Sequence, residues 1–342
     1  MPNTPTKILL MSTMMSGILI SMSSSSWIGA WMGLEINLMS FIPLMSNNED
    51  MFMTESSLKY FIVQAMSSSL LMFIIMLEVM MEDMFTMKYE NINMMINMTP
   101  LLLKSGAAPF HWWFPSVMEG LSWMNCLLLM TMQKAAPLML ISYMMKVNSF
   151  SSIIILSSTI IGAIGGLNQL SIRKILTYSS INHTGWMLAA LMINENMWIM
   201  YFVIYSMLTM TIVMIIKPFN TSFINQTLLM NKEMNMMKFM MFTTLLSMGG
   251  LPPFMGFLPK WIIIQMMIIN DMNAMMTTMV VMSLLTLYFY LRMSYSSFMM
   301  LHIEPKWNIS YYKNNNFMMY SSMLFSMSMM SLMICTMMIN VY

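Results

Sequence analysis

The chain has 342 residues, of which 58% are hydrophobic and only 8% are charged, and its formal net charge is +2. So small a net charge excludes the strongly basic surface that binding of nucleic acid requires. Apolar runs of roughly 18–24 residues recur along the whole chain, which is long enough for helices to cross about 30 Å of hydrocarbon. The runs lack the strict alternation of barrel strands, so the composition predicts an all-α, polytopic membrane protein.

Methionine and cysteine narrow the possible chemistry further. The 61 methionines are spread along nearly every apolar run, which favours core and lipid-facing packing over copper binding. Such enrichment is typical of proteins encoded in animal mitochondrial genomes. Cys126 and Cys335 lie alone in separate apolar runs, where they cannot ligate an iron–sulfur cluster or zinc. We expect both to be small buried hydrophobic residues.

Eleven membrane spans are predicted in chain order. The first residues lack the Arg-rich pattern of a mitochondrial presequence, so we expect the chain to open directly on a span. The predicted spans are 8–24, 26–45, 57–81, 92–110, 121–144, 150–170, 174–193, 196–216, 237–270 (broken near 249–259), 275–298 and 318–341. The longest connections, 217–236 and 299–317, are too short to hold a separate domain. The whole of 1–342 is therefore predicted to be one membrane domain.

Basic residues in the connections predict the orientation of these spans. The face of the N-terminus collects eight of them, and the opposite face collects only Lys88 and Lys146. The eight are Lys7, Arg173, Lys174, Lys217, Lys232, Lys238, Lys306 and Lys313. Basic connections stay on the inner side of a membrane. In a mitochondrion, the N-terminus would then face the matrix and the C-terminus the intermembrane space.

The pattern Pro-Phe-x-x-x-x-Pro occurs twice, at 109–115 and at 253–259, each time after small residues. Proline and glycine interrupt a helix, so each of these two boxes predicts a broken span. The boxes fall in the fourth and ninth predicted spans, and helices five spans apart run in opposite directions. The pattern therefore predicts two inverted-topology repeats of five helices, about 1–146 and about 150–298, with an extra span at 318–341.

Four charged residues lie deep inside predicted spans: Glu35, Lys104, Lys134 and Lys260. A charge at the bilayer centre costs about 2.5–3.5 kcal/mol, so we expect these side chains to face the interior of the bundle. Lysine can lose and regain its proton, whereas arginine stays charged. The four residues are therefore candidates for a proton path, with Glu35 pairing with Lys104 in one state and releasing it in another. The alternative is a static ion pair with lysines that reach to the membrane surface.

The three histidines differ in what their positions suggest. His183 lies in the middle of the seventh span, within SSINHTGWM, and could relay protons between Lys134 and Lys260. A core histidine bonded to a backbone carbonyl is the alternative. His111 lies in the first box, and His302 lies in a connection and receives no role. Three scattered histidines do not favour a haem held by two of them.

Other catalytic motifs are absent from the sequence. It contains no P-loop, no dinucleotide-binding glycine pattern and no nucleophile elbow. The glycine-rich run 162–166 lies inside a span and is interpreted as a site of close helix packing. We therefore expect this chain itself to bind no nucleotide, flavin or metal.

Several stretches together resemble the antiporter-like membrane subunits of respiratory complex I. They are SSSSWIGAWMGLEINLMSFIPL, TESSLKYF, LLLKSGAAPFHWWFPSVMEGLSWMN, QKAAPLMLISY, IGAIGGLNQLSIRKILTYSSINHTGWM, LSMGGLPPFMGFLPKW and YFYLRMSYSSFM. By motif match, Glu35, Lys104, Lys134 and Lys260 fall on the central hydrophilic axis of that family, and His183 matches its INHxGW motif. Animal members lack three N-terminal helices of bacterial relatives, which agrees with eleven spans.

The resemblance implies a proton-translocating core subunit of NADH:ubiquinone oxidoreductase in the mitochondrial inner membrane. NADH, FMN, iron–sulfur clusters and ubiquinone would bind to other subunits of the complex, and this chain would bind no cofactor. Its partners would be other membrane-arm subunits, membrane lipids and protons, but no nucleic acid. Two alternatives stay open: a free-standing cation/proton antiporter, and a structural membrane subunit that no longer conducts protons.

Overall fold

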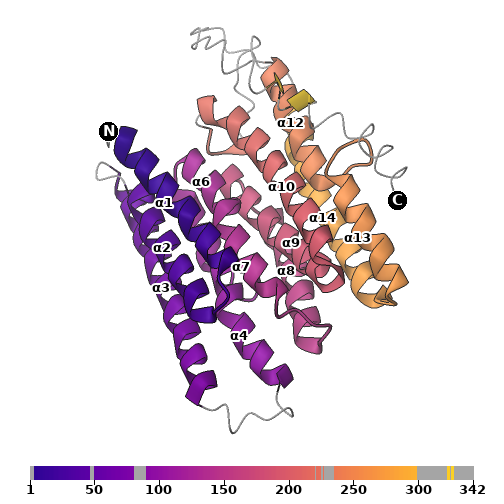
Figure 1. The fold of residues 1–342 in the computed structure, drawn as a ribbon. Helices are drawn as coiled ribbons and strands as arrows, with labels where there is room; N and C mark the ends of the chain where they lie inside the picture. Colours follow the sequence, from indigo (N-terminus) through magenta and orange to yellow (C-terminus); the bar gives the residue numbers. More distant parts are fainter. Residues whose placement is uncertain are drawn as a thin grey trace. The chain divides into compact units, whose positions relative to one another are not determined.

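The computed structural model describes residues 4–46, 50–80, 90–219, 221–224, 226, 235–298, 322–323 and 325–326. These residues form helices, and the only extended pairing among them is an isolated bridge between Ser171 and Phe223. Figure 1 shows this helical architecture, and the predicted all-α membrane fold is confirmed. The chain divides into two compact units, Met1–Ser158 and Thr159–Tyr342, which we describe one at a time.

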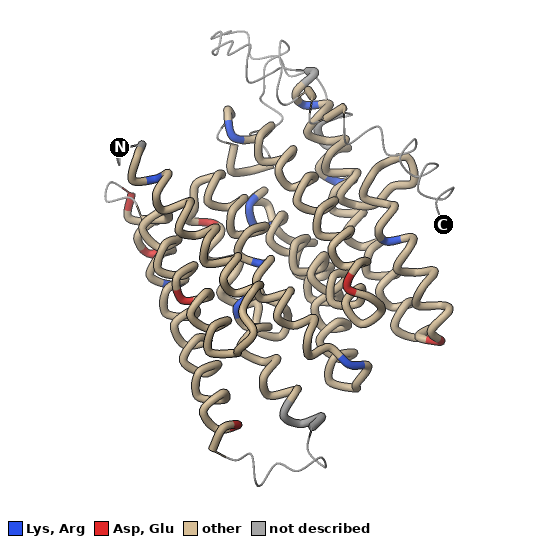
Figure 2. The backbone as a smooth tube through the Cα atoms, in the orientation of Figure 1, with Lys and Arg blue, Asp and Glu red and all other residues tan. Residues whose placement is uncertain are grey.

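Seven helices of the described part are long and apolar enough to cross a membrane, and charged residues are sparse along them (Figure 2). They cover Pro5–Ser23, Trp27–Met45, Met51–Met80, Trp123–Ser142, Ser149–Leu167, Glu195–Ile216 and Asn273–Tyr295. The predicted spans 92–110, 174–193 and 237–270 instead correspond to helices that are short, polar or interrupted. The predicted span 318–341 lies almost entirely outside the described residues.

The described residues of the first unit form seven helices and part of an eighth. They are α1 (Thr4–Ser23), α2 (Trp27–Met45), α3 (Met51–Met80), α4 (Glu90–Ser105), α5 (Trp113–Gly120), α6 (Trp123–Met130), α7 (Met132–Ser142) and the first half of α8 (Ser149–Leu167). Helices α1 and α2 pack backbone against backbone, because a Cβ on Gly33 would lie 2.5 Å from the Ser21 nitrogen. Ser26 caps α2 by accepting a hydrogen bond from the Gly29 N–H at 3.2 Å.

One predicted span of this unit needs correction, and another contains an interruption. The fourth span was expected to continue to 110, but α4 ends at Ser105 because Gly106 turns the backbone into the left-handed region. The fifth predicted span, 121–144, corresponds to the candidate span Trp123–Ser142, within which Thr131 separates α6 from α7. The Thr131 hydroxyl donates to the Leu127 carbonyl at 2.8 Å, and such bonding back to the preceding turn bends helices.

The second unit contains the other boxed helix. Its elements are the second half of α8, α9 (Ile172–Ile193), α10 (Glu195–Ile216), η2 (Lys217–Phe219), α12 (Asn235–Gly249), α13 (Phe257–Ile269) and α14 (Asn273–Phe298). The predicted break near 249–259 is confirmed by the gap between α12 and α13. A Cβ on Gly162 would lie 2.5 Å from the Asn182 nitrogen, and one on Gly166 would meet Phe289 at 2.9 Å. The glycine run is thus a site of close packing, as predicted.

Many serine and threonine hydroxyls inside these helices are satisfied locally. The Ser67 hydroxyl donates to the Gln64 carbonyl at 2.7 Å, and the Thr211 hydroxyl donates to the Leu208 carbonyl at 2.7 Å. This bonding to the carbonyl three residues earlier lets serine and threonine occupy apolar spans without an unpaired donor. The boundary between the compact units lies inside α8 rather than at 146–150, and the two-repeat organisation stays a prediction.

Candidate functional site

Both boxed helices break by the same backbone chemistry. Helix α4 ends at Ser105 and is followed by Gly106 at φ 71°, while α12 ends at Gly249 and is followed by Gly250 at φ 84°. Glycine adopts this left-handed conformation without the strain that a Cβ would cause. The Gly106 N–H donates to the Leu103 carbonyl at 3.3 Å. The remaining carbonyls at each helix end require donors from elsewhere.

At the first break, neutral groups supply these donors. The Trp113 indole donates to the Leu103 carbonyl at 3.2 Å, and the Gln64 amide donates to the Lys104 carbonyl at 3.4 Å. The Ala107 N–H reaches back to the Leu102 carbonyl at 3.2 Å. The ammonium of Lys104 is therefore not needed to close this helix end.

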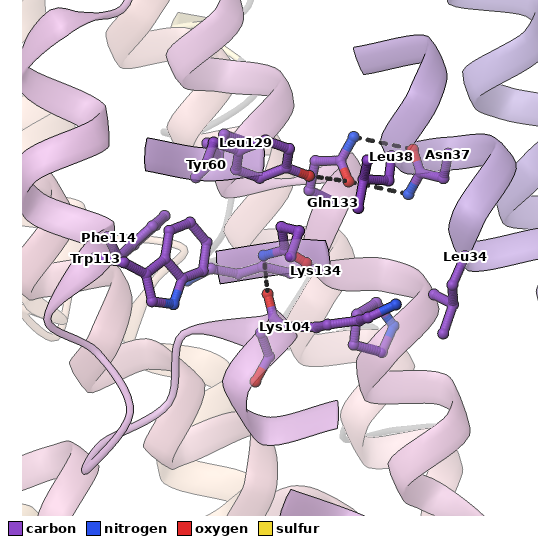
Figure 3. A pocket seen from close by; sticks show the side chains of 13 residues that line it. Leu34, Asn37, Leu38, Tyr60, Lys104, Trp113, Phe114, Leu129, Gln133 and Lys134 are labelled. Carbon is purple, nitrogen blue, oxygen red and sulfur yellow. Dashed lines mark hydrogen bonds between the residues drawn. The ribbon is translucent and has the colours of Figure 1, made fainter. Parts of the chain in front are cut away.

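Lys104 and Lys134 line one small cavity in the first unit (Figure 3). They are only 6% and 2% exposed, respectively. The cavity has about 10 Å³ of room, close to what a single water molecule needs. The Lys134 ammonium lies 4.6 Å from the centre of the Phe114 ring, a cation–π contact that stabilises its charge. The structure thus brings two of the predicted lysines together.

A neutral polar cluster from three helices lines the same cavity. Asn37 of α2 and Gln133 of α7 exchange two hydrogen bonds through their side-chain amides, both at 2.9 Å. The Tyr60 hydroxyl of α3 donates to Gln133 Oε1 at 3.2 Å, and Figure 3 shows this arrangement. Sequence reasoning missed these residues because it searched for charges. The helical spacing of Tyr60, Gln64 and Ser67, which share one face of α3, is the signal that would have found them.

Glu35 is half-buried, and it lines an apolar surface groove together with Leu9 and Leu10 of α1. Its Oε2 atom is buried and has no hydrogen-bond partner in the described part of the chain. Glu35 interacts electrostatically with Lys104, but no ion pair within 4.0 Å joins these two described residues. The predicted direct pairing is therefore not formed here, and the switching between paired and released states stays a prediction.

Lys260 lies in the first turns of α13 and reaches back to the end of α12. Its ammonium donates to the Gly249 carbonyl at 3.0 Å and lies 3.5 Å from the Met248 carbonyl oxygen. It also lies 5.9 Å from the centre of the Trp186 ring, and the residue is 5% exposed. The carbonyl end of a helix carries a partial negative charge, so the end of α12 stabilises this buried ammonium.

His183 is buried in α9 beside two tyrosines. Its Nδ1 atom lies 2.7 Å from the Tyr201 hydroxyl, and its ring centre lies 5.1 Å from that of Tyr205. A phenol is thus a partner of Nδ1. His183 and Lys260 belong to the second unit and Lys134 to the first, so a relay among the three stays a prediction.

The remaining candidate residues have simpler surroundings. His111 is buried, with Nδ1 3.3 Å from the Pro109 carbonyl oxygen and its ring tilted against that of Trp112. Cys126 is buried as expected, whereas Cys335 and His302 lie outside the described residues. Within the described ranges, no three His, Cys, Asp or Glu side chains gather in a way that could hold a metal ion.

Comparison with known proteins defines the family. The chain matches the family described as NADH:quinone oxidoreductase/Mrp antiporter, TM, over residues 24–286. It is 46% identical over 336 residues to NADH-ubiquinone oxidoreductase chain 2 of Locusta migratoria, covering 98% of this chain and 97% of the relative. The protein of the same name from Anopheles gambiae is 52% identical over 300 residues, or 87% of each chain.

A solved structure shares the fold. A chain of respiratory complex I from Thermus thermophilus superposes with a TM-score of 0.81 at 18% identity, over 97% of this chain and 79% of that chain. The resemblance predicted from the sequence motifs is confirmed, and both of these relatives are insect proteins. The chain belongs to the NADH:quinone oxidoreductase/Mrp antiporter family, in the group named NADH-ubiquinone oxidoreductase chain 2.

Proposed function

We propose that this chain translocates protons as a core membrane subunit of NADH:ubiquinone oxidoreductase in the mitochondrial inner membrane. The names of its relatives support the assignment to that enzyme. The observation that carries the proton-translocating role is the burial of Lys104, Lys134 and Lys260 beside helix interruptions. Buried lysines in apolar spans are costly, and ionisable residues inside membrane spans commonly mark ion or proton pathways.

The proposed proton path uses Glu35, Lys104, Lys134, His183 and Lys260. Lysine suits this role because desolvation favours its neutral form and nearby negative groups favour its charged form, so it can visit both states. The three lysines are stabilised by different groups: the more distant Glu35 carboxylate, the Phe114 ring and the end of α12. Changes in neighbouring subunits would shift protons among these sites.

We also infer an orientation and an internal repeat. The distribution of basic residues supports an N-terminus in the matrix and a C-terminus in the intermembrane space. The shared break geometry of α4–α5 and α12–α13 supports two inverted repeats, about 1–146 and about 150–298. NADH, FMN, iron–sulfur clusters and ubiquinone would bind to other subunits, and membrane lipids and other membrane-arm subunits would cover the apolar outer faces.

The substitution Lys134→Met in the intact complex tests the proton-translocating role. It keeps an unbranched side chain of similar bulk while it removes the titratable group. We expect fewer protons translocated per electron pair in reconstituted vesicles, measured together with NADH:ubiquinone turnover. Lys146→Met, at an exposed position just after α7 in the same unit, is the matched control and should leave the ratio unchanged. An unchanged ratio in both Lys134→Met and Lys260→Met would contradict the proposal and favour a structural subunit.

Isolation of the native membrane complex tests the free-standing antiporter. Mild solubilisation followed by native electrophoresis and mass spectrometry should find this chain together with redox subunits of the oxidoreductase. Migration alone, or only with copies of itself, would contradict the assignment to that enzyme and favour the antiporter.

A further inference from the structure

Lys134 lies in a short stretch of α7 that is interrupted on both sides. Before it, Thr131 separates α6 from α7, with φ −111° and ψ −77°. After it, Pro137 has no backbone N–H, so it cannot donate to the Gln133 carbonyl one turn earlier. The helical backbone therefore constrains residues 132–136 less than it would in a continuous span. The direction of the Lys134 side chain consequently depends on contacts with other helices.

Gln133, the neighbour of Lys134 in the chain, makes such contacts with two other helices. Its side-chain amide donates to Asn37 Oδ1 of α2 and accepts from Asn37 Nδ2, both at 2.9 Å. Its Oε1 atom also accepts from the Tyr60 hydroxyl of α3 at 3.2 Å. None of these three residues is more than 9% exposed, so bulk water does not compete for the hydrogen bonds. Figure 3 shows this polar cluster of Asn37, Tyr60 and Gln133 beside Lys134.

The reciprocal bonding of Asn37 and Gln133 fixes the orientation of α7 as well as its distance from α2. Each amide offers a donor and an acceptor, and the two hydrogen bonds form together only when the amides face each other. Successive side chains on a helix point about 100° apart, so fixing Gln133 also fixes the direction of Lys134. The Lys134 ammonium lies 4.6 Å from the centre of the Phe114 ring. The bonds of Gln133 thus help to hold Lys134 in its cation–π contact.

Tyr60 connects the amide pair to the first helix break. Its ring centre lies 5.3 Å from that of Phe41 on α2 and 5.9 Å from that of Trp113, whose indole caps the end of α4. The polar cluster therefore joins α2, α3, the break after α4 and the start of α7. These elements surround the small cavity that Lys104 and Lys134 line.

The polar cluster keeps its hydrogen bonds whatever the charge of Lys134, because side-chain amides do not titrate. Lys260 differs, because its own ammonium makes the bond that holds it. We propose that Asn37, Tyr60 and Gln133 are positioning residues that hold Lys134 in one place while it is protonated and while it is neutral. This inference rests on the proposed function, because it requires Lys134 to exchange protons during turnover.

Two sets of substitutions test the positioning role in the intact complex. The triple variant Asn37→Leu, Tyr60→Phe and Gln133→Met replaces every member of the cluster with an apolar side chain of similar size, which can leave stability nearly unchanged. We expect it to lower the number of protons translocated per electron pair nearly as far as Lys134→Met does, because a misplaced transfer group loses much of its rate. The exchange Asn37→Gln with Gln133→Asn keeps the total length of the pair. It should restore the ratio that each of its single substitutions lowers.

Two comparisons separate positioning from a general loss of structure. Asn125→Leu is the matched control, because it removes a side-chain amide bond of 2.9 Å from α6 to the Leu44 carbonyl of α2, before the interruption at Thr131. It should leave the ratio of protons to electrons unchanged. Adding the triple variant to Lys134→Met should lower the ratio no further than Lys134→Met alone, because both changes act through the same lysine.

The outcomes distinguish this inference from the proposed function. A normal ratio in the assembled triple variant, with a lowered ratio in Lys134→Met, would overturn the positioning role and leave the proposed function standing. A further loss when the two are combined, or an exchanged pair no better than its single substitutions, would also overturn the positioning role. A normal ratio in Lys134→Met would overturn it too, and a normal ratio in both Lys134→Met and Lys260→Met would overturn the proposed function as well.

Discussion

The two broken helices end in the same way but use their lysines differently. At the end of α4, the Trp113 indole and the Gln64 amide occupy the free carbonyls, and Lys104 faces the small cavity. At the end of α12, Lys260 itself donates to the last carbonyl. A neutral cap leaves the first lysine available to other partners. A charged cap ties the second lysine to the backbone, so its charge stabilises the helix end in addition to its role in the proposed proton path.

The two boxes also differ at one equivalent position. The fourth residue of the box is Trp112 in the first copy and Gly256 in the second. Trp112 is 81% exposed, whereas a Cβ on Gly256 would lie 1.9 Å from the Ser247 carbonyl oxygen. The second break is thus folded more tightly, with α13 returning onto the end of α12. The same Pro-Phe-x-x-x-x-Pro pattern therefore allows an open break in one unit and a compact break in the other.

The largest expected effect comes from this equivalent position. Gly256→Ala should destabilise the subunit by more than about 3 kcal/mol, because backbone atoms would have to move to relieve the overlap. Trp112→Ala should change stability by less than about 0.5 kcal/mol, as exposed substitutions usually do. The amount of assembled complex and its rate of thermal inactivation measure the stability of both variants. Equal losses in the two variants would show that the breaks do not differ in compactness.

Removing each lysine should separate its structural role from its transport role. Lys260→Met leaves the end of α12 without its donor and should cost about 1–3 kcal/mol. Lys104→Met removes a buried charge that caps no carbonyl, so it should be neutral or stabilising. Both should lower proton translocation per electron pair. Thermal inactivation of the two purified complexes measures the difference in stability. If Lys104→Met were less stable than Lys260→Met, the conclusion that only Lys260 caps a helix end would be contradicted.

The glycines after each helix form a matched pair for substitution by alanine. Gly106→Ala and Gly250→Ala should each cost about 1–2 kcal/mol, because alanine is strained at positive φ. At Gly106 the new Cβ would make ordinary contacts at 3.5 Å with the Trp113 and Phe114 rings. At Gly250 it would come within 3.2 Å of the Lys260 side chain. We therefore expect Gly250→Ala to lose more proton translocation than Gly106→Ala. A larger loss from Gly106→Ala would contradict the idea that the turn at Gly250 positions Lys260.

The smallest expected effect concerns the neutral cap. Trp113→Phe keeps an aromatic ring at the first break but removes the donor to the Leu103 carbonyl, at a cost of about 1 kcal/mol. At the equivalent position of the second box, Phe257 already lacks such a donor, and Phe257→Leu should leave the Lys260 cap intact. Hydrogen exchange of the amides just after each break measures local opening. Faster exchange only after α4 in Trp113→Phe would support the difference between the caps.

The sequence predicted the architecture well because the signals for membrane helices are strong. Hydrophobic length placed most of the helices, and the two Pro-Phe boxes predicted both breaks. The interruption at Thr131 was missed, because a threonine inside an apolar run has no distinctive signal and its bond to Leu127 depends on the local turn. The end of α4 was placed too late, although the glycine at 106 followed by Pro109 is a recognisable stop.

The candidate site was predicted only in part for a similar reason. Searching for charges in apolar spans found Lys104, Lys134 and Lys260, all of which are buried. It did not find neutral partners such as Gln133 and Tyr205, because polar uncharged residues are common in spans and only tertiary contacts distinguish them. The position of Glu35 at a surface groove depends on which face of α2 meets α1, and no local pattern determines that.

The hydrogen bond between Lys260 and the end of α12 also couples the protonation of Lys260 to the conformation of the turn between α12 and α13. A hydrogen bond from a charged donor is roughly twice as strong as one from a neutral donor. In the proposed proton path Lys260 gives up its proton, which would weaken its hydrogen bond to the Gly249 carbonyl and loosen the compact turn from α12 to α13. Force applied to that turn would in return change how readily the lysine releases its proton. In the proposed proton path, this single contact of 3.0 Å would convert strain in the backbone into proton movement, and proton movement into strain.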